Sequence, residues 1–136
     1  MSAIDIDRIA VIGAGKMGST LIHALLERTE LEPGQIVATR KQLEPLKQIA
    51  ETEGVAISTD NREAVDKAGL ILLCVKPQMV EAVLDEIASA LDSNQVVVSI
   101  AAGVTTRQIE DRLTAGIPVI RVMPNTASLI GASMTA

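Results

Sequence analysis

Short apolar runs rich in β-branched residues alternate along the chain with segments whose apolar residues recur at helical spacing. The runs predict strands, which we place at residues 8–12, 35–39, 55–58, 70–75, 95–100 and 118–123. The intervening segments predict helices at residues 16–28, 42–53, 60–68, 79–91 and 105–116. Asp60 and Thr105 carry side chains typical of helix N-caps. Strands that alternate with helices indicate an α/β fold with a parallel sheet.

The first predicted strand ends in a glycine-rich turn, Gly13-Ala14-Gly15-Lys16-Met17-Gly18, and a helical pattern begins immediately after it. In a GxGxxG turn the first glycine permits a tight turn. The second lets the backbone approach a pyrophosphate, and the third lets the helix pack on the strand. The free N–H groups at the helix start favour phosphate. The turn therefore predicts a dinucleotide-binding site, the alternative being a turn with a purely structural role.

Six strands and this first turn predict a Rossmann-type doubly wound parallel sheet, with strand order 3-2-1-4-5-6 and helices on both faces. We expect residues 1–136 to form one NAD(P)-binding domain, since a chain of this length can bury a single core. Ligands of such sheets bind beyond the carboxyl ends of the strands, at the switch point between strands one and four. The chemically unusual loops of the chain fall at that edge, at residues 13–18, 39–41, 74–78, 100–103 and 124–126.

Several residues at this edge allow two interpretations. Lys76 and Pro77 either contact a cofactor or are a solvated lysine and a proline that ends a strand. Asn61 either caps a helix or contacts a ligand. The small side chains of Ala101 and Ala102 either leave room for a cofactor ring or simply precede a helix.

The end of the second predicted strand bears on the choice of cofactor. An NAD site usually has Asp or Glu there to bind the ribose 2′-hydroxyl, whereas this chain has Thr39, Arg40 and Lys41. A guanidinium can pair with a 2′-phosphate that a carboxylate would repel. We therefore expect NADP(H) to be preferred, with NAD(H) as a second candidate. The alternative is that Arg40 and Lys41 are ordinary surface charges.

Composition narrows the function classes. The formal net charge is −5 and aromatic residues are absent, which argues against a nucleic-acid partner. The apolar runs are too short to cross a membrane and the N-terminus does not resemble a signal peptide, so we expect a cytoplasmic protein. The single cysteine, Cys74, lies in an apolar run, where a structural thiol is expected. His23 falls on a solvated helix face, and neither metal-binding nor covalent-hydrolase motifs are found.

Five stretches form a set with a characteristic order and spacing, at residues 12–18, 60–61, 75–78, 99–104 and 121–126. Together they resemble the Δ1-pyrroline-5-carboxylate reductase family, which makes L-proline. The resemblance implies hydride transfer from a nicotinamide to the C=N carbon of pyrroline-5-carboxylate, a small-molecule substrate. With the glycine motif, it implies cofactor contacts at the strand ends, from Ile12, Gly13, Ala14, Gly15, Lys16, Met17, Gly18, Thr39, Arg40, Asn61, Cys74, Val75, Lys76, Pro77, Ile100, Ala101 and Ala102.

The resemblance also implies a part that this sequence lacks. Members of the family carry a C-terminal helical domain that dimerises and completes the substrate pocket, and these 136 residues do not include it. We therefore expect a fragment of a longer protein, inactive alone, whose catalytic residues are unknown and which forms homo-oligomers only with that domain. Ala127 also stands where the family usually has proline, which would loosen the loop before it.

Two other functions fit the same residues. One is a non-catalytic module that binds or senses NADP(H), which the short chain favours. The other is a β-hydroxyacid-type dehydrogenase, whose opening GxGxMG is similar. That group usually has a glycine-rich substrate loop after strand six, and residues 124–126 do not have that composition.

Overall fold

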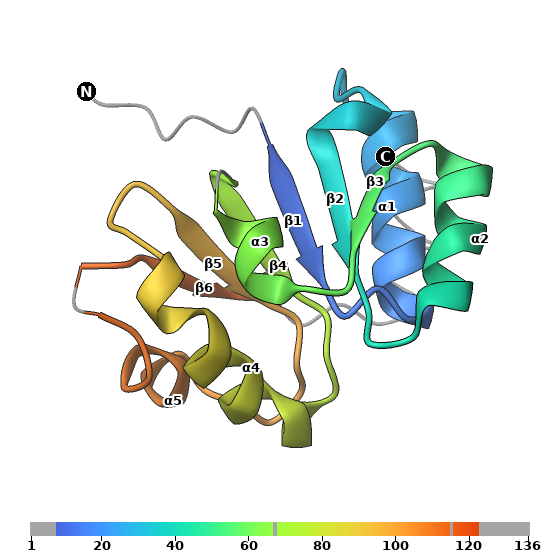
Figure 1. The fold of residues 1–136 in the computed structure, drawn as a ribbon. Helices are drawn as coiled ribbons and strands as arrows, with labels where there is room; N and C mark the ends of the chain where they lie inside the picture. The colour runs from blue at the N-terminus through green and yellow to red at the C-terminus, as the bar shows by residue number, and fades with distance from the viewer. Residues whose placement is uncertain (1–7, 67, 115, 123–136) are drawn as a thin grey trace.

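The computed structural model describes residues 8–66, 68–114 and 116–122. Within these residues, six strands form one parallel sheet in the order β3-β2-β1-β4-β5-β6 (Figure 1), which confirms the predicted fold class and strand order. The strands are β1 Ile9–Ile12, β2 Ile36–Thr39, β3 Ala56–Ser58, β4 Leu70–Leu73, β5 Val96–Ser99 and β6 Val119–Arg121. The α-helices are α1 Lys16–Arg28, α2 Leu43–Glu53, α3 Asn61–Val65, α4 Val80–Ile87 and α5 Thr106–Glu110.

The side chains of β1 alternate between two apolar cores, one on each face of the sheet. Ile9 and Val11 pack with residues of α1 and α2, whereas Ala10 and Ile12 pack with residues of α3, α4 and α5. Figure 1 shows the same division, with α1 and α2 on one side of the sheet and the other helices opposite. A strand covered on both faces must be apolar throughout, which explains the continuous apolar run of β1.

The helix predicted at residues 79–91 is one α-helix between two single turns of 3-10 helix, η2 Pro77–Met79 and η3 Ala88–Ala90. The helix predicted to reach residue 116 is shorter than expected, because α5 ends at Glu110. After it, the N–H groups of Arg112 and Leu113 bond to carbonyls three residues earlier. This tighter geometry is typical of a last helical turn and ends α5 early.

Two predicted helix starts are confirmed. The Asp60 side chain accepts hydrogen bonds from the N–H groups of Arg62 and Glu63 at the start of α3. Thr105 and Gln108 form a reciprocal capping box at the start of α5. In both helices the cap satisfies N–H groups that have no partner within the helix.

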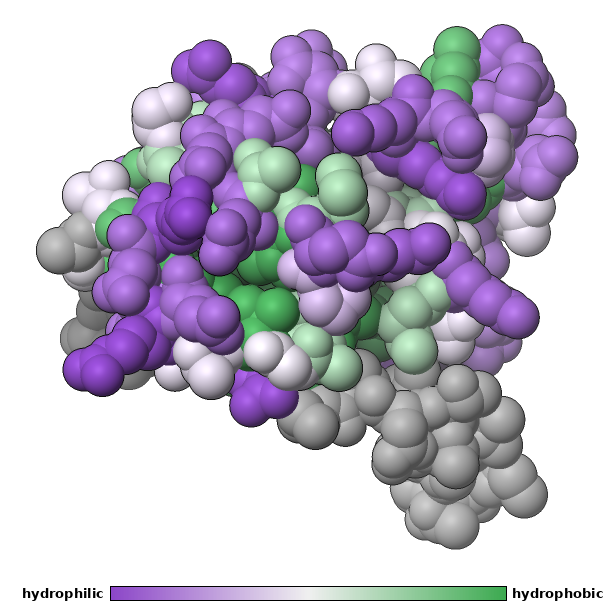
Figure 2. Space-filling view, turned by 90° about the horizontal axis from the view of Figure 1, so that it is seen from below, coloured by the Kyte–Doolittle hydropathy of each residue, from purple (hydrophilic) through white to green (hydrophobic). Residues whose placement is uncertain are grey.

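All strands run in the same direction, so their carboxyl ends and the loops after them meet at one edge of the sheet. Figure 2 views the molecule from that edge and shows apolar surface inside a hydrophilic rim. Among the described helices, none combines the length and the apolar character needed to span a bilayer. The edge of the sheet is therefore the place to look for a binding site.

A buried glutamine ties α3 to the loop before β5. The Gln95 side chain is 5% exposed, and its Nε2 donates to the carbonyl oxygens of Val65 and Ala68, each at 2.7 Å. Its Oε1 accepts from the N–H of Asp92 at 2.8 Å. One side chain thus satisfies three backbone groups that lie between elements of the fold.

We expect Gln95→Leu to lower the free energy of unfolding by about 2–3 kcal/mol, because a leucine of similar size leaves these backbone groups unpaired. Gln48→Leu, at an exposed position on α2, is the matched control and should change it by less than about 0.5 kcal/mol. Urea unfolding curves of both variants measure the difference. Equal midpoints for the two variants would contradict this role of Gln95.

Candidate dinucleotide-binding site

The first glycine of the motif after β1 has no room for a side chain, and the last one, in the first turn of α1, has little. Gly13 has a φ of 81°, and a Cβ there would collide with Cγ1 of Val75. A Cβ on Gly18 would lie 3.3 Å from the carbonyl oxygen of Gly13, so α1 packs directly on the turn. A Cβ on Gly15 would meet no described atom within 4 Å. The tight turn and the close helix packing predicted for Gly13 and Gly18 are therefore confirmed, whereas Gly15 borders open space.

Thr39, the last residue of β2, holds this turn in place. Its carbonyl oxygen accepts the N–H groups of Gly13 at 3.1 Å and Ala14 at 2.7 Å. Its hydroxyl oxygen also accepts from the Gly13 N–H, at 3.2 Å. Thr39 is 1% exposed, so these bonds form away from solvent and fix the loops after β1 and β2 to one another.

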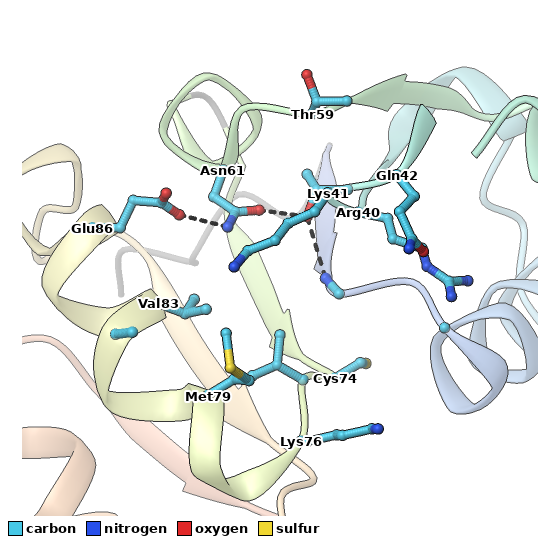
Figure 3. A pocket seen from close by; sticks show the side chains of 15 residues that line it. Arg40, Lys41, Gln42, Thr59, Asn61, Cys74, Lys76, Met79, Val83 and Glu86 are labelled. Carbon is cyan, nitrogen blue, oxygen red and sulfur yellow. Dashed lines mark hydrogen bonds between the residues drawn. The ribbon is translucent and has the colours of Figure 1, made fainter. Parts of the chain in front are cut away.

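A chain of side-chain hydrogen bonds continues from Thr39 across the edge of the sheet. The Thr39 hydroxyl donates to Oδ1 of Asn61 at 2.5 Å, and Nδ2 of Asn61 donates to Oε1 of Glu86 at 2.6 Å (Figure 3). Asn61 is the first residue of α3, and the cap is Asp60. The alternative in which Asn61 caps the helix is therefore wrong.

A cleft of about 480 Å³ opens between α4 and the loops after β1, β2 and β4 (Figure 3). It brings together eight of the residues predicted to contact a cofactor, namely Gly13, Gly15, Thr39, Arg40, Asn61, Cys74, Val75 and Lys76. The structure thus brings these residues from separate strand ends together around one cleft. Their contact with a cofactor stays a prediction.

The other residues predicted to contact a cofactor lie outside this cleft. Ile12 and Ala14 are fully buried in the two cores, and Gly18 is buried where α1 meets β1. Lys16 borders a second hollow and Pro77 a third. Met17 is half-buried in α1, and the remaining three residues follow β5, namely Ile100, Ala101 and Ala102. Residues 124–126, expected to form the loop after the sixth strand, lie outside the described residues.

Seven lining residues were absent from the predicted contact set, namely Lys41, Gln42, Thr59, Met79, Ala82, Val83 and Glu86. Met79, Ala82, Val83 and Glu86 recur at helical spacing and form one face of η2 and α4. That spacing is visible in the sequence. The sequence does not reveal that this face borders the cleft, because that depends on how α4 is rotated against the sheet.

The cleft is basic although the chain is acidic. Arg40, Lys41 and Lys76 line it, while the chain has a net charge of −5. Arg40 also borders the second hollow, which it shares with Lys16 and Ser19 at the start of α1. In the view of Figure 3, Lys41 extends over the cleft towards α4 and Arg40 points away from α4. The two neighbouring cations thus point in different directions from the end of β2.

The start of α1 is suited to an anion. Its N-cap is Gly15, the described first turn has neither a side-chain cap nor an acidic residue, and Lys16 begins the helix. Free N–H groups and the helix dipole attract negative charge at such a position. Within the described residues, no group of three or more His, Cys, Asp and Glu side chains is arranged to hold a metal ion.

Cys74 lines the cleft without being reactive. Burial raises the pKa of its thiol to about 12, because the thiolate would lose its solvation. The thiol is therefore neutral at physiological pH and is a poor nucleophile. This agrees with the expectation of a structural thiol.

Comparison with known protein families identifies the family to which this fold and its cleft belong. A family model described as "NADP oxidoreductase coenzyme F420-dependent" matches residues 8–103. The chain belongs to this family. The matched region runs from β1 to the loop after β5, and it therefore contains every residue that lines the cleft.

Individual relatives carry the name that the sequence motifs suggest. A pyrroline-5-carboxylate reductase of Corynebacterium melassecola is 41% identical over 130 residues, which are 93% of this chain and 48% of that protein. A solved structure of the Coxiella burnetii enzyme of that name has a TM-score of 0.86 and 32% identity, and the match covers 93% of this chain and 47% of that one. A Plasmodium falciparum pyrroline carboxylate reductase with NADP bound has a TM-score of 0.77 at 23% identity, covering 91% and 44%. The chain thus spans about half the length of these relatives.

The different surroundings of Gly13 and Gly15 lead to a stability test. We expect Gly13→Ala to lower the free energy of unfolding by roughly 2–4 kcal/mol, because alanine disfavours the positive φ and collides with Val75. Gly15→Ala should cost about 1 kcal/mol or less, since its Cβ meets open space. Thermal or urea unfolding distinguishes the two. Similar losses for both variants would mean that the turn tolerates a side chain at Gly13.

Proposed function

We propose that this chain is the cofactor-binding part of an NADPH-dependent reductase that converts Δ1-pyrroline-5-carboxylate to L-proline. The observation that carries the proposal is the 41% identity over 130 residues to a protein named pyrroline-5-carboxylate reductase. A match of that length includes the glycine turn and the loops after β2 and β4. The substrate is a small molecule, and its binding residues belong to the part of the relatives that this chain does not cover.

The described residues fit a nicotinamide dinucleotide. The missing Cβ of Gly15 leaves open space beside the uncapped start of α1, where a diphosphate would be held by backbone N–H groups. Arg40 would hold the adenosine side, on a loop that Thr39 and Asn61 help to fix, and Val75 and Lys76 would contact the ribose beyond it. When bound, the reduced nicotinamide supplies the hydride for the C=N carbon. The chain itself binds and orients the cofactor, through loops that Thr39 holds together.

NADP(H) is the preferred cofactor in this proposal, and NAD(H) is the weaker one. The end of β2 carries Arg40 and Lys41 where an NAD site usually has a carboxylate. A guanidinium pairs with a phosphate through charge-assisted hydrogen bonds. The relative with NADP bound is consistent with this choice. The protein is cytoplasmic in this proposal, without nucleic-acid or membrane partners, and homo-oligomers form through a part that corresponds to the half of the relatives that this chain does not cover.

The activity is tested with the protein encoded by the complete reading frame. We expect NADPH oxidation to depend on added pyrroline-5-carboxylate and to yield one L-proline per NADPH consumed, measured by loss of absorbance at the nicotinamide band and by amino-acid analysis. The 136-residue chain should bind NADPH without turnover. Binding without proline formation by the complete protein would refute the activity and leave the cofactor assignment standing.

The cofactor preference is tested by titrating the 136-residue chain with NADPH and NADH. We expect tighter binding of NADPH, and we expect Arg40→Ala to raise the Kd for NADPH roughly tenfold while changing that for NADH by less than about twofold. Arg107→Ala, an exposed arginine on α5 away from the cleft, is the matched control. Equal affinity of the unaltered chain for both cofactors would remove the proposed preference.

A further inference from the structure

One carboxylate faces a cleft whose other charged side chains are cations. Among the described lining residues, Glu86 is the one acid, whereas Arg40, Lys41 and Lys76 are cations. It lies on α4, one turn beyond Ala82 and Val83. The face of α4 that borders the cleft is therefore apolar near its start and acidic at its far end.

The hydrogen-bond chain from the glycine turn fixes the position of this carboxylate. The Thr39 hydroxyl accepts from Gly13 and therefore uses its single hydrogen on Oδ1 of Asn61. The Asn61 amide is thereby oriented with Nδ2 towards Glu86, whose Oε1 accepts at 2.6 Å. Oε2 of Glu86 makes no hydrogen bond with the described residues and has free lone pairs. The carboxylate is thus a positioned acceptor at the end of the cleft.

The shape of the cleft limits which part of a dinucleotide reaches Glu86. The glycine turn, which we propose to hold the diphosphate, and Glu86 lie at the two ends of the hydrogen-bond chain through Thr39 and Asn61. Met79, Ala82 and Val83 form an apolar part of the lining that suits a flat base. The ring nitrogens of adenine on its outer edge accept hydrogen bonds, and the exocyclic amino group donates them. A carboxylate is complementary only to that amino group.

We propose that Glu86 is a specificity-determining residue that accepts a hydrogen bond from the exocyclic amino group of the adenine base. This inference rests on the proposed function, since it takes the adenosine half of the cofactor to occupy the cleft. Asn61 acts as the positioning residue, because it holds the carboxylate through Nδ2. The cofactor is therefore read at two separate points: Arg40 reads the 2′-phosphate and Glu86 reads the base.

The test compares NADPH with reduced nicotinamide hypoxanthine dinucleotide phosphate, in which a carbonyl oxygen replaces the adenine amino group. Both ligands have the same phosphates, riboses and nicotinamide, so a difference in Kd reports on the base. The chain has no Phe, Trp or Tyr, so the fluorescence of the reduced nicotinamide can be followed without protein background. The variants are Glu86→Gln and, as the matched control, Glu81→Gln on the same helix, whose carboxylate pairs with Arg112.

We expect the unaltered chain to bind NADPH at least about tenfold more tightly than the hypoxanthine analogue, as for loss of a hydrogen bond to a charged group. Glu86→Gln should abolish or reverse this preference, because the amide oxygen keeps the bond to Nδ2 of Asn61 and the amide nitrogen then faces the base, where it can donate to the hypoxanthine carbonyl but cannot accept from the adenine amine. Glu81→Gln should keep the original ratio.

Three results separate the possible failures. Equal binding of both ligands by the unaltered chain overturns the role of Glu86 and leaves the proposed function intact. A preference for NADPH that persists in Glu86→Gln also overturns it, because another group must then read the amine. Absence of NADPH binding by the folded chain, checked by circular dichroism, refutes the proposed function and this inference with it.

Discussion

The turn that follows β1 is the constraint on which the whole binding edge depends. The N–H groups of Gly13 and Ala14 both point at one carbonyl oxygen, that of Thr39, at 3.1 and 2.7 Å. Only glycine can make this turn, because φ is positive and Val75 stands where a Cβ would lie. The loops after β1, β2 and β4 are therefore locked together by backbone contacts. The start of α1 is consequently held beside the cleft.

This locked backbone explains how an acidic protein can present a basic cleft. The charge of the whole chain would repel a polyphosphate, but fields near a cleft are set mainly by the closest groups and by helix ends. Arg40, Lys41 and Lys76 stand at the ends of β2 and β4, on loops whose positions the turn fixes. Few side chains are therefore needed, because backbone N–H groups supply part of the positive potential.

The sequence is sufficient for those features that depend on local pattern and on general rules of chain topology. Strand positions, the glycine turn and the caps Asp60 and Thr105 follow from neighbouring residues, and the strand order follows from right-handed crossovers. The link from Thr39 to Asn61 and on to Glu86 joins three separate elements, whose bonded partners are 22 and 25 positions apart in the sequence. It depends on how α3 and α4 are rotated about their own axes, which no local pattern encodes. For that reason the sequence places Asn61 at the site only through the family resemblance, and Glu86, which belongs to none of the resembling stretches, is not placed there at all.

The hydrogen-bond inventory separates residues that build the site from residues that face a ligand. Thr39 is 1% exposed, and its hydroxyl accepts from Gly13 and donates its single hydrogen to Asn61. It therefore fixes the cleft rather than donating to a ligand. Lys41, Lys76 and Glu86 are exposed and keep free hydrogen-bonding capacity towards the cleft. The buried residues that shape the site already have their hydrogen bonds, so less conformational freedom is lost when a ligand binds. The charged side chains at the surface are therefore available to discriminate between ligands.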